Sequence, residues 1–479
     1  MRKGVLHYAL GLFFACSYAV GAAQPNILFC IADDWSWPHA SIYGDKVVRT
    51  PTFDRVAKEG ALFTQTFCAS PSCTPSRAAI LTGRYPHQLR EGGNLWGFLP
   101  YEFPVFPDLL AKAGYTIGLQ GKGWGPGNFE AGGWKRNPAG PAFKSFDQFL
   151  KSVPKGKPFF FWFGSSDPHR PYDAGTGAGA GMDRESVSRP ACFPDSPEVR
   201  SDILDYYFEV QRFDGQIAKM LKLLEDSGQL DNTIIVITSD NGMPFPRCKT
   251  NLYDSGCRMP LAIRWPKNVK AGATIDELVS LIDLAPTFLE VAEVKPVSGI
   301  IGKSLLPLLA GAAKQQRDAV FFERERHANV RKGDLGYPSR AVRTKDFLYI
   351  RNLRPDRWPA GDPTMWKAVG AFGDIDESPS KTYIMQHRSD TGVAPFFELA
   401  MAKRPAEELY DLSKDPGQTN NVAGVATYAE AQKGMAARLD SWMKETKDPR
   451  ASGGGDEFDK YPYFGMAPQN RTRSNLVGK

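Results

Sequence analysis

Short continuous apolar runs, each ending in polar residues, recur along the first part of the chain. They lie at residues 26–32, 115–119, 158–164 and 233–238, and their length fits buried strands better than helices. Helical patterns separate them, most clearly the amphipathic stretch at residues 201–224. Buried strands that alternate with helices are typical of a mostly parallel sheet between two helical layers, so the pattern predicts an α/β fold.

The pattern changes after residue 311. Shorter strands are predicted at residues 320–322, 341–350 and 408–411, without helices between them, and a helix carrying Leu439 and Trp442 follows. Such an arrangement is typical of an α+β unit. The sequence therefore predicts three segments: a leader at 1–23, a large α/β domain at 24–315, and a smaller C-terminal α+β subdomain with an irregular tail at 316–479.

The leader has the pattern of an export signal. Arg2 and Lys3 precede an apolar run at residues 5–20, which is short for a membrane span and is followed by small residues up to Ala23. Lipid attachment at Cys16 is the alternative, although the residues before it fit that signal poorly. We therefore expect a secreted or periplasmic chain with no transmembrane span.

Composition excludes several classes of function. The formal net charge of +6 over 479 residues is mild and indicates no nucleic-acid partner. The seven cysteines include no CxxC spacing, so no zinc site is predicted, and Cys248 with Cys257 is the favoured disulfide pair. The alternating glycines at residues 175–181 follow no strand and indicate a surface loop rather than a nucleotide site.

Polar residues follow the carboxyl ends of the apolar runs, at the edge where open α/β sheets bind ligands. In chain order they are Asp33, Asp34, Lys122, Asp167, His169, Arg170, Asp240 and Asn241. The acids and the amide at the ends of the first and last runs are hard oxygen donors. They predict a calcium site, with magnesium as the alternative.

One further stretch, Ser72-Cys73-Thr74-Pro75-Ser76-Arg77, combines a helix start with charge. A helix is expected to begin at Cys73, because proline is tolerated in a first turn and Gly83 can close the helix. Cys73 would then lie where free backbone N–H groups attract an anion. Arg77 adds a permanent positive charge one turn later.

The motif Cys-X-Pro-Ser-Arg resembles the signature of the type I sulfatases, in which a maturation enzyme converts the cysteine to formylglycine (3-oxoalanine). The resemblance covers nearly the whole chain after the leader and implies an alkaline-phosphatase-like fold and hydrolysis of a sulfated saccharide. A homodimer is one assembly open to the chain, and the sequence does not define the oligomeric state. The resemblance implies that the metal ligands are Asp33, Asp34, Asp240, Asn241 and modified Cys73. The catalytic residues that it implies are Cys73, Arg77, Lys122, His169 and Lys249. The substrate-binding residues that it implies are Asp167, Arg170, Trp124 and His327.

Within the family the chain resembles the N-sulfoglucosamine sulfohydrolase branch, through Asp167-Pro168-His169-Arg170 and Thr250-Asn251-Leu252-Tyr253. That makes N-sulfated glucosamine of heparan or heparin the first expected substrate. The alternatives are an O-sulfated sugar of another polysaccharide, a phosphodiester or phosphonate, and a catalytically silent saccharide-binding role.

The chain departs from the family pattern at two positions. Lys249 stands where the N-sulfoglucosamine sulfohydrolases have arginine, which binds oxyanions with a different geometry. Trp124 stands where many members have a histidine that accepts the last proton. Two groups can substitute for that base: Lys122 with a lowered pKa, or a water held by Trp124 and an acid.

Overall fold

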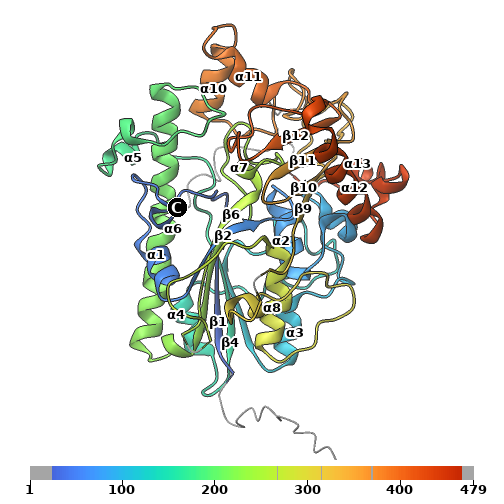
Figure 1. Cartoon of the computed structure of the whole chain (residues 1–479). Helices are drawn as coiled ribbons and strands as arrows, with labels where there is room; N and C mark the ends of the chain where they lie inside the picture. The colour runs from blue at the N-terminus through green and yellow to red at the C-terminus, as the bar shows by residue number, and fades with distance from the viewer. Residues whose placement is uncertain (1–23, 267, 314, 368–369, 466–479) are drawn as a thin grey trace, which may run out of the picture.

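The computed structural model describes residues 24–465, except 267, 314 and 368–369. The predicted leader, with Cys16, lies outside the described residues. An eight-stranded sheet forms the centre of the molecule (Figure 1). Its strands, in spatial order, are β3 (Thr116–Gly121), β4 (Phe159–Gly164), β1 (Asn26–Ala32), β5 (Thr233–Ser239), β6 (Arg258–Arg264), β2 (Ala61–Phe67) and β7 (Ala273–Ile275), with β8 (Val279–Ser280) also paired to β2.

The four predicted strands form a continuous parallel block of this sheet, in the order β3, β4, β1 and β5. Every residue of β1 is buried, and Ile27 lies opposite Phe160 of β4 and Ile234 of β5. The prediction of a mostly parallel α/β sheet is confirmed. The sequence did not predict β6, which runs antiparallel to β5 and β2, because Pro260 lies inside it and proline usually marks a strand edge.

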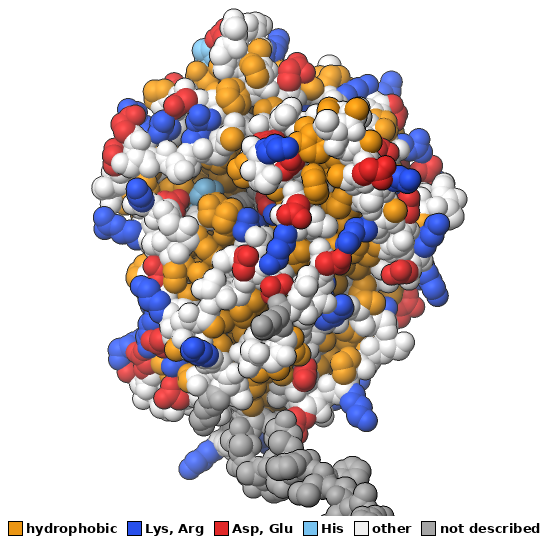
Figure 2. All heavy atoms as spheres, viewed as in Figure 1, with side chains coloured by type: hydrophobic (Ala, Val, Ile, Leu, Met, Phe, Trp, Pro, Cys, Tyr) orange, Lys and Arg blue, Asp and Glu red, His pale blue; other side chains and the backbone are white. Residues whose placement is uncertain are grey.

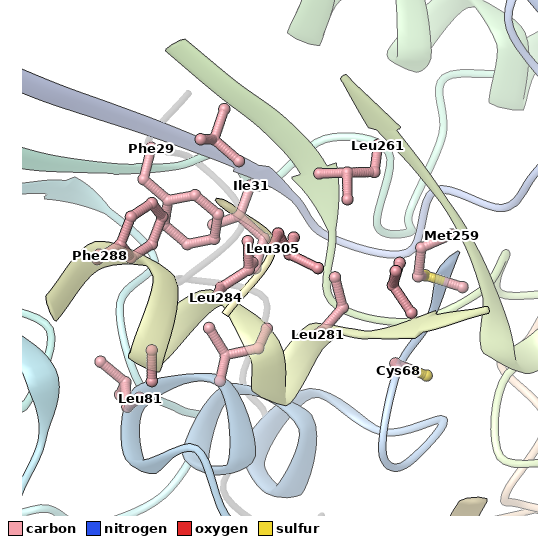
Figure 3. Packing of buried hydrophobic residues seen from close by; sticks show 14 of the residues in the cluster. Phe29, Ile31, Cys68, Leu81, Met259, Leu261, Leu281, Leu284, Phe288 and Leu305 are labelled. Atoms are coloured by element: carbon pink, nitrogen blue, oxygen red, sulfur yellow. The ribbon is translucent and has the colours of Figure 1, made fainter. Parts of the chain in front are cut away.

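Helices cover both faces of the sheet (Figure 1). On one face lie α1 (Pro51–Lys58), α4 (Phe146–Ser152) and α6 (Pro197–Asp226), and on the other α2 (Cys73–Thr82), α3 (Phe106–Lys112) and α8 (Leu284–Val291). Figure 3 shows Phe29 and Ile31 of β1 against Leu284 and Phe288 of α8, with Leu81 of α2 beside them. The helix that begins at Cys73 thereby packs against α8, which in turn covers the central strand.

Helix α2 begins and ends where the sequence predicts. Its N-cap Ser72 is extended, and Gly83 closes the helix in the left-handed conformation with φ 64°. A side chain at Gly83 would meet Ile300, so glycine suits both the turn and the packing. All residues of α2 are buried, which makes the helix a rigid support for its N-terminus.

Short helices complete the large domain: α5 (Thr176–Gly179), α7 (Asp254–Cys257) and α9 (Leu306–Leu309). The prediction of a surface loop at residues 175–181 is wrong in part, because this stretch forms α5 against α6. Asp205 of α6 accepts hydrogen bonds of 2.9 Å from the backbone of Gly175 and Gly177.

The C-terminal part is built on a four-stranded antiparallel sheet. Its strands are β9 (Val320–Arg324), β10 (Ser339–Arg343), β11 (Phe347–Asn352) and β12 (Glu407–Asp411), and its helices are α10 (Pro379–Gln386), α11 (Ala394–Met401), α12 (Ala429–Glu445) and α13 (Glu457–Lys460). The expectation of no intervening helices is wrong, since α10 and α11 separate β11 from β12. The two sheets share one hydrophobic core, in which Phe67 stacks on Phe322, and the boundary at residue 315 stays a prediction.

The expected Cys248–Cys257 disulfide is also wrong, because all the cysteines among the described residues are free. The pairing of β2 with β6 brings Cys68, rather than Cys248, beside Cys257, with a backbone hydrogen bond of 2.9 Å between them. Cys248 instead lies next to Cys192.

Basic and acidic side chains are interspersed over the face shown in Figure 2, which has no extended patch of one sign. Within residues 24–465, apart from the positions excepted above, no helix combines the length and the apolar character that a membrane crossing needs.

Candidate active site

The carboxyl ends of β1, β3, β4 and β5 meet the N-terminus of α2 at one edge of the large sheet. Asp33 and Asp34 follow β1, and Asp240 and Asn241 follow β5. Because parallel strands end at the same edge, residues distant in sequence are brought together there. Cys73 begins the helix that faces them.

The acids and Cys73 form a compact cluster. Ligand atoms of Asp33, Asp34 and Cys73 all lie within 4.8 Å of one another, and the Cys73 Sγ is 3.4 Å from Asp33 Oδ1. Asp240 Oδ1 accepts a hydrogen bond of 3.1 Å from the backbone N–H of Asp34. Asp34 itself has φ 79°, a strained conformation of the kind found at functional sites.

Asn241 gives the clearest sign that this cluster suits a cation. Its amide nitrogen donates to Asp34 Oδ1 at 2.7 Å, whereas its buried Oδ1 has no hydrogen-bond partner among the described residues. A buried oxygen without a donor is costly unless something positive contacts it. Carboxylates and an amide oxygen in one cluster are ligands that calcium and magnesium accept.

Each acid of the cluster also contacts a basic side chain. The Lys122 Nζ lies 2.7 Å from both carboxylate oxygens of Asp33, and the Lys249 Nζ lies 2.7 Å from Asp34 Oδ2. The Arg77 Nε lies 2.7 Å from Asp240 Oδ2. The site therefore combines negative and positive groups without leaving either sign unbalanced.

Burial and these ion pairs shift the carboxyl groups in opposite directions. Burial alone would raise the pKa of Asp33, but the positive charge of Lys122 and its neighbours outweighs burial and lowers that pKa. For Asp240 burial dominates over the attraction of Arg77, and its pKa rises to about 6. Asp33 is therefore the more firmly ionised of the two.

Lys122 does not fit the role of the missing base. Burial lowers its pKa, but Asp33 and Cys73 raise it by more, so the net shift is upward and the ammonium group keeps its proton. Trp124 is 3% exposed and packs in the core. Its buried Nε1 finds no acceptor in the part of the chain that the structure describes, which leaves a water on Trp124 as the other candidate.

Cys73 is a neutral thiol in this environment. Burial raises its pKa well above the usual range, although Lys122 and Lys249 act in the opposite direction. The thiolate is the reactive form of cysteine and its metal-binding form. An unmodified Cys73 is therefore a poor nucleophile and a poor metal ligand.

His169 is the most open polar group of the cluster, with 35% of its side chain exposed. Its Nδ1 lies 2.5 Å from the backbone oxygen of Arg170, so Nδ1 carries a proton, and its Nε2 lies 3.8 Å from Asp34 Oδ2. The free nitrogen therefore faces the acids and can exchange a proton with a bound molecule.

Arg77 and Arg170 are engaged inside the protein. The buried Arg77 guanidinium donates to Asp240 and to the backbone oxygens of Lys122 and Gly123. Arg170 forms two hydrogen bonds of 2.8 Å with Asp202 and leaves 7% of its side chain exposed. Both arginines hold neighbouring groups in place, and substrate contact by Arg170 stays a prediction.

Asp167 and His327 also lie beneath the open surface. Asp167 is fully buried and faces Gln216. The His327 Nδ1 lies 2.8 Å from the Ser72 Oγ, directly behind Cys73, and burial lowers the pKa of His327 to about 3. Neither residue has a described contact with the open part of the site, so their substrate-binding roles stay predictions.

Sequence reasoning missed Asp376, whose carboxylate lies 3.5 Å from the Lys249 Nζ. It also missed Asp202, the partner of Arg170. Residues 370–378 have no strand or helix periodicity and match no motif, so no pattern in the sequence indicated that this segment reaches the site.

An acidic cluster with lysines, a histidine and a helix N-terminus at the carboxyl edge of a parallel sheet is suited to hydrolysis of an anionic ester. With this sheet order, it defines a hydrolase of the alkaline-phosphatase-like fold. More particularly, the chain belongs to the sulfatase family, whose model, described as Sulfatase, matches residues 25–294. A second model, N-sulphoglucosamine sulphohydrolase, C-terminal, matches residues 248–362.

Individual relatives agree with this membership. The chain is 28% identical to human N-sulphoglucosamine sulphohydrolase over 498 residues, covering 89% of this chain and 91% of that protein. It is 29% identical over 442 residues to an ulvan-active sulfatase of Formosa agariphila, covering 89% and 81%.

Solved structures share the fold. A protein in complex with its substrate D-glucosamine-2-N,6-O-disulfate has a TM-score of 0.64 at 23% identity, covering 89% of this chain and 98% of that chain. The phosphonate monoester hydrolase of Agrobacterium radiobacter has a TM-score of 0.62 at 19% identity, covering 88% and 96%.

Proposed function

We propose that this sulfatase releases sulfate from a sulfated saccharide, and that terminal N-sulfated glucosamine of heparan or heparin is its substrate. The observation that carries the proposal is the match of residues 248–362 to the N-sulphoglucosamine sulphohydrolase C-terminal model. That segment contains Lys249, a positive group in direct contact with the acids. The similarity to the human enzyme over 89% of the chain supports the same substrate class.

We further infer that Asp33, Asp34, Asp240 and Asn241 hold a divalent cation, calcium before magnesium. The unpartnered Asn241 Oδ1 supports this inference. We also infer that a maturation enzyme converts Cys73 to formylglycine, because the buried neutral thiol is unreactive. Formylglycine at residue 73, with a cation held by Asp33, Asp34, Asp240 and Asn241, would supply a hydroxyl nucleophile that the thiol does not offer.

The protein's own groups bind the sulfate and move one proton. Lys122 and Lys249 both have raised pKa values and remain positive beside the bound anion. The N–H groups that begin α2 add a partial positive charge at the same place. The His169 Nε2 gives its proton to the departing nitrogen or oxygen of the sugar. Arg77 acts as a positioning residue, since its donors hold Asp240 and the residues after β3.

Sulfate release from defined saccharides tests this proposal. Protein made together with a formylglycine-generating enzyme is given N-sulfated glucosamine, 6-O-sulfated N-acetylglucosamine and a sulfated ulvan oligosaccharide. We expect release from the N-sulfated sugar first, and aldehyde at residue 73 by peptide mass spectrometry. The matched control is Cys192→Ala, a buried cysteine outside the site, which should keep activity, whereas Cys73→Ala should lose more than roughly 1,000-fold.

Each result bears on a separate part of the proposal. An intact thiol in fully active protein overturns the role of formylglycine. Release from an O-sulfated sugar alone replaces the substrate, and an absence of release from every saccharide by aldehyde-bearing protein overturns the enzymatic function.

We also propose that the mature chain acts outside the cytoplasm, on the strength of Arg2, Lys3 and the apolar run that follows. N-terminal sequencing of the exported protein should begin near Gln24. A mature protein that retains Met1 contradicts cleavage of the leader.

A further inference from the structure

An acid from the C-terminal part of the chain reaches the rim of the active site. Asp376 lies between β11 and α10, and its Oδ2 is 3.5 Å from the Lys249 Nζ. The same Nζ donates to Asp34 Oδ2 at 2.7 Å. One ammonium group therefore separates Asp376 from the acidic cluster, and 32% of the Asp376 side chain is exposed.

The charged neighbours of Asp376 show which part of the active site its carboxylate faces. Burial would raise its pKa, but the positive charge of Lys249, with smaller effects of His169 and His327, lowers the pKa to about 2. Asp376 is thus an anion close to Lys249 and His169. Asp376 therefore lies on the side of the site that carries Lys249 and His169, and His169 is the proton donor to the departing group in the proposed function. Lys122 is bound instead to Asp33.

The segment that carries Asp376 is fixed on both sides. Ahead of it, Asp374 accepts hydrogen bonds of 2.6 Å from Arg324 and Arg331. After it, the Ser380 Oγ donates to Asp202 Oδ2 at 2.6 Å. The exposed carboxylate is therefore held on a rigid support, as a group that selects between ligands needs to be.

We propose that Asp376 is a specificity residue for the departing sugar: it accepts hydrogen bonds from hydroxyl or amino groups beside the scissile sulfate and disfavours a second anionic group there. A partly desolvated carboxylate forms strong hydrogen bonds with neutral or positive donors. A second sulfate or a carboxylate in the same place meets a like charge that has few waters to screen it. This inference rests on the proposed function, because it requires a saccharide in the site.

A purely structural role for Asp376 has different consequences. If Asp376 only orients Lys249, its removal affects every sulfate ester alike, because Lys249 faces the sulfate itself. A contact with the sugar affects saccharides alone. An aryl sulfate, whose departing group has no hydroxyl or amino substituents, separates the two roles.

The test compares Asp376→Asn with Glu377→Gln, the neighbouring acid. Glu377 is 76% exposed and pairs with Lys381, so it has no described contact with the site. Sulfate release is measured as kcat and KM with a monosulfated amino sugar, its disulfated counterpart and an aryl sulfate. Thermal unfolding of both variants shows whether they are folded.

For Asp376→Asn, kcat/KM with the monosulfated sugar should fall by about 10- to 100-fold, the scale of a lost hydrogen bond to a charged group, mainly through KM. With the aryl sulfate it should change by less than about 3-fold, within the effect of an exposed ion pair. The ratio of disulfated to monosulfated activity should rise. Glu377→Gln should match the wild type, and Asp376→Glu, which keeps the charge, should restore part of the preference.

Equal losses with saccharide and aryl sulfate overturn the inference, and so does an unchanged preference in Asp376→Asn. If that variant does not fold, Asp376→Glu decides, because equal losses with saccharide and aryl sulfate in Asp376→Glu also overturn the inference. A wild-type protein that cleaves the aryl sulfate and no saccharide overturns the proposed function instead, and this inference with it.

Discussion

The floor and the rim of the active site differ in how their charges are compensated. The floor, formed by Asp33, Asp34, Cys73, Arg77 and Asp240, is buried, and each of its acids is paired with a basic side chain. The rim, formed by Lys122, His169 and Asp376, is between 22% and 35% exposed. Groups of the rim are therefore partly open to solvent, whereas those of the floor are covered by protein.

Because of this difference, breaking an ion pair should change the free energy of unfolding more in the floor than in the rim. A buried ion pair that loses one partner leaves an uncompensated charge in a medium of low polarity, whereas water compensates an exposed one. Substitutions in the ion pairs of the floor should lower stability as well as activity, whereas substitutions in the rim should change catalysis or preference with little effect on stability.

The largest expected effect on stability is that of Arg77→Ala. Arg77 and Asp240 both have 0% side-chain exposure, so the substitution leaves Asp240 buried without its partner. We expect a loss of about 3–5 kcal/mol in the free energy of unfolding, measured by urea denaturation. His169→Ala should change that free energy by less than about 1 kcal/mol while lowering turnover by roughly 100- to 10,000-fold.

Arg184→Ala is the matched control, because Arg184 pairs with Glu185 on the surface, where their side chains are 46% and 70% exposed. It should change stability by less than about 0.5 kcal/mol. If Arg77→Ala lowers the free energy of unfolding no more than this control does, the buried ion pairs of the floor do not stabilise the fold more than exposed pairs do.

Metal removal should have a smaller effect, because the described contacts already balance the acids of the floor. Chelation should abolish sulfate release yet leave the chain folded. Calcium at about 100 times its dissociation constant should then add about 2.7 kcal/mol of stability. Asn241→Ala removes the unpartnered oxygen and should weaken this calcium response. A chain that unfolds on chelation shows that the cation, rather than Arg77 and the lysines, holds the floor together.

The floor was predictable from the sequence and the rim only in part. Asp33 and Asp240 follow long apolar strands, and Cys73 stands in a continuous motif, so local patterns indicate all three. Asp376 reaches the site through tertiary contacts alone, since Ser380 binds Asp202 and Asp202 holds Arg170.

The fold follows the same rule. The parallel strands have strong apolar runs without proline, whereas the apolar run of β6 contains Pro260 and helix α10 has no comparable apolar pattern. Helix α10 is fixed by its packing against α6, and β6 contains a proline that sequence rules place at strand edges. Elements whose position depends on distant partners were the ones that the sequence did not indicate.

The smallest expected effect concerns His327, which lies against Ser72 behind the floor and stays unprotonated at neutral pH. Its pKa in the folded chain is about 3, against an ordinary value of 6.5, and burial is the main cause. As pH falls below 6.5 the unfolded chain takes up a proton that the folded chain refuses, so stability rises with pH between these two values. Between pH 7 and pH 5 this group alone should remove about 2 kcal/mol of stability.

His327→Gln tests this, because glutamine can still bond to Ser72 and does not titrate. Urea denaturation at pH 7 and pH 5 should show a smaller acid loss for this variant than for the wild type. His387→Gln, at a histidine whose side chain is 42% exposed, should keep the wild-type slope. An identical slope in all three proteins means that His327 becomes charged in the folded chain. The region in which burial opposes a charge then ends at the acids of the floor, and the difference between floor and rim is smaller than we infer.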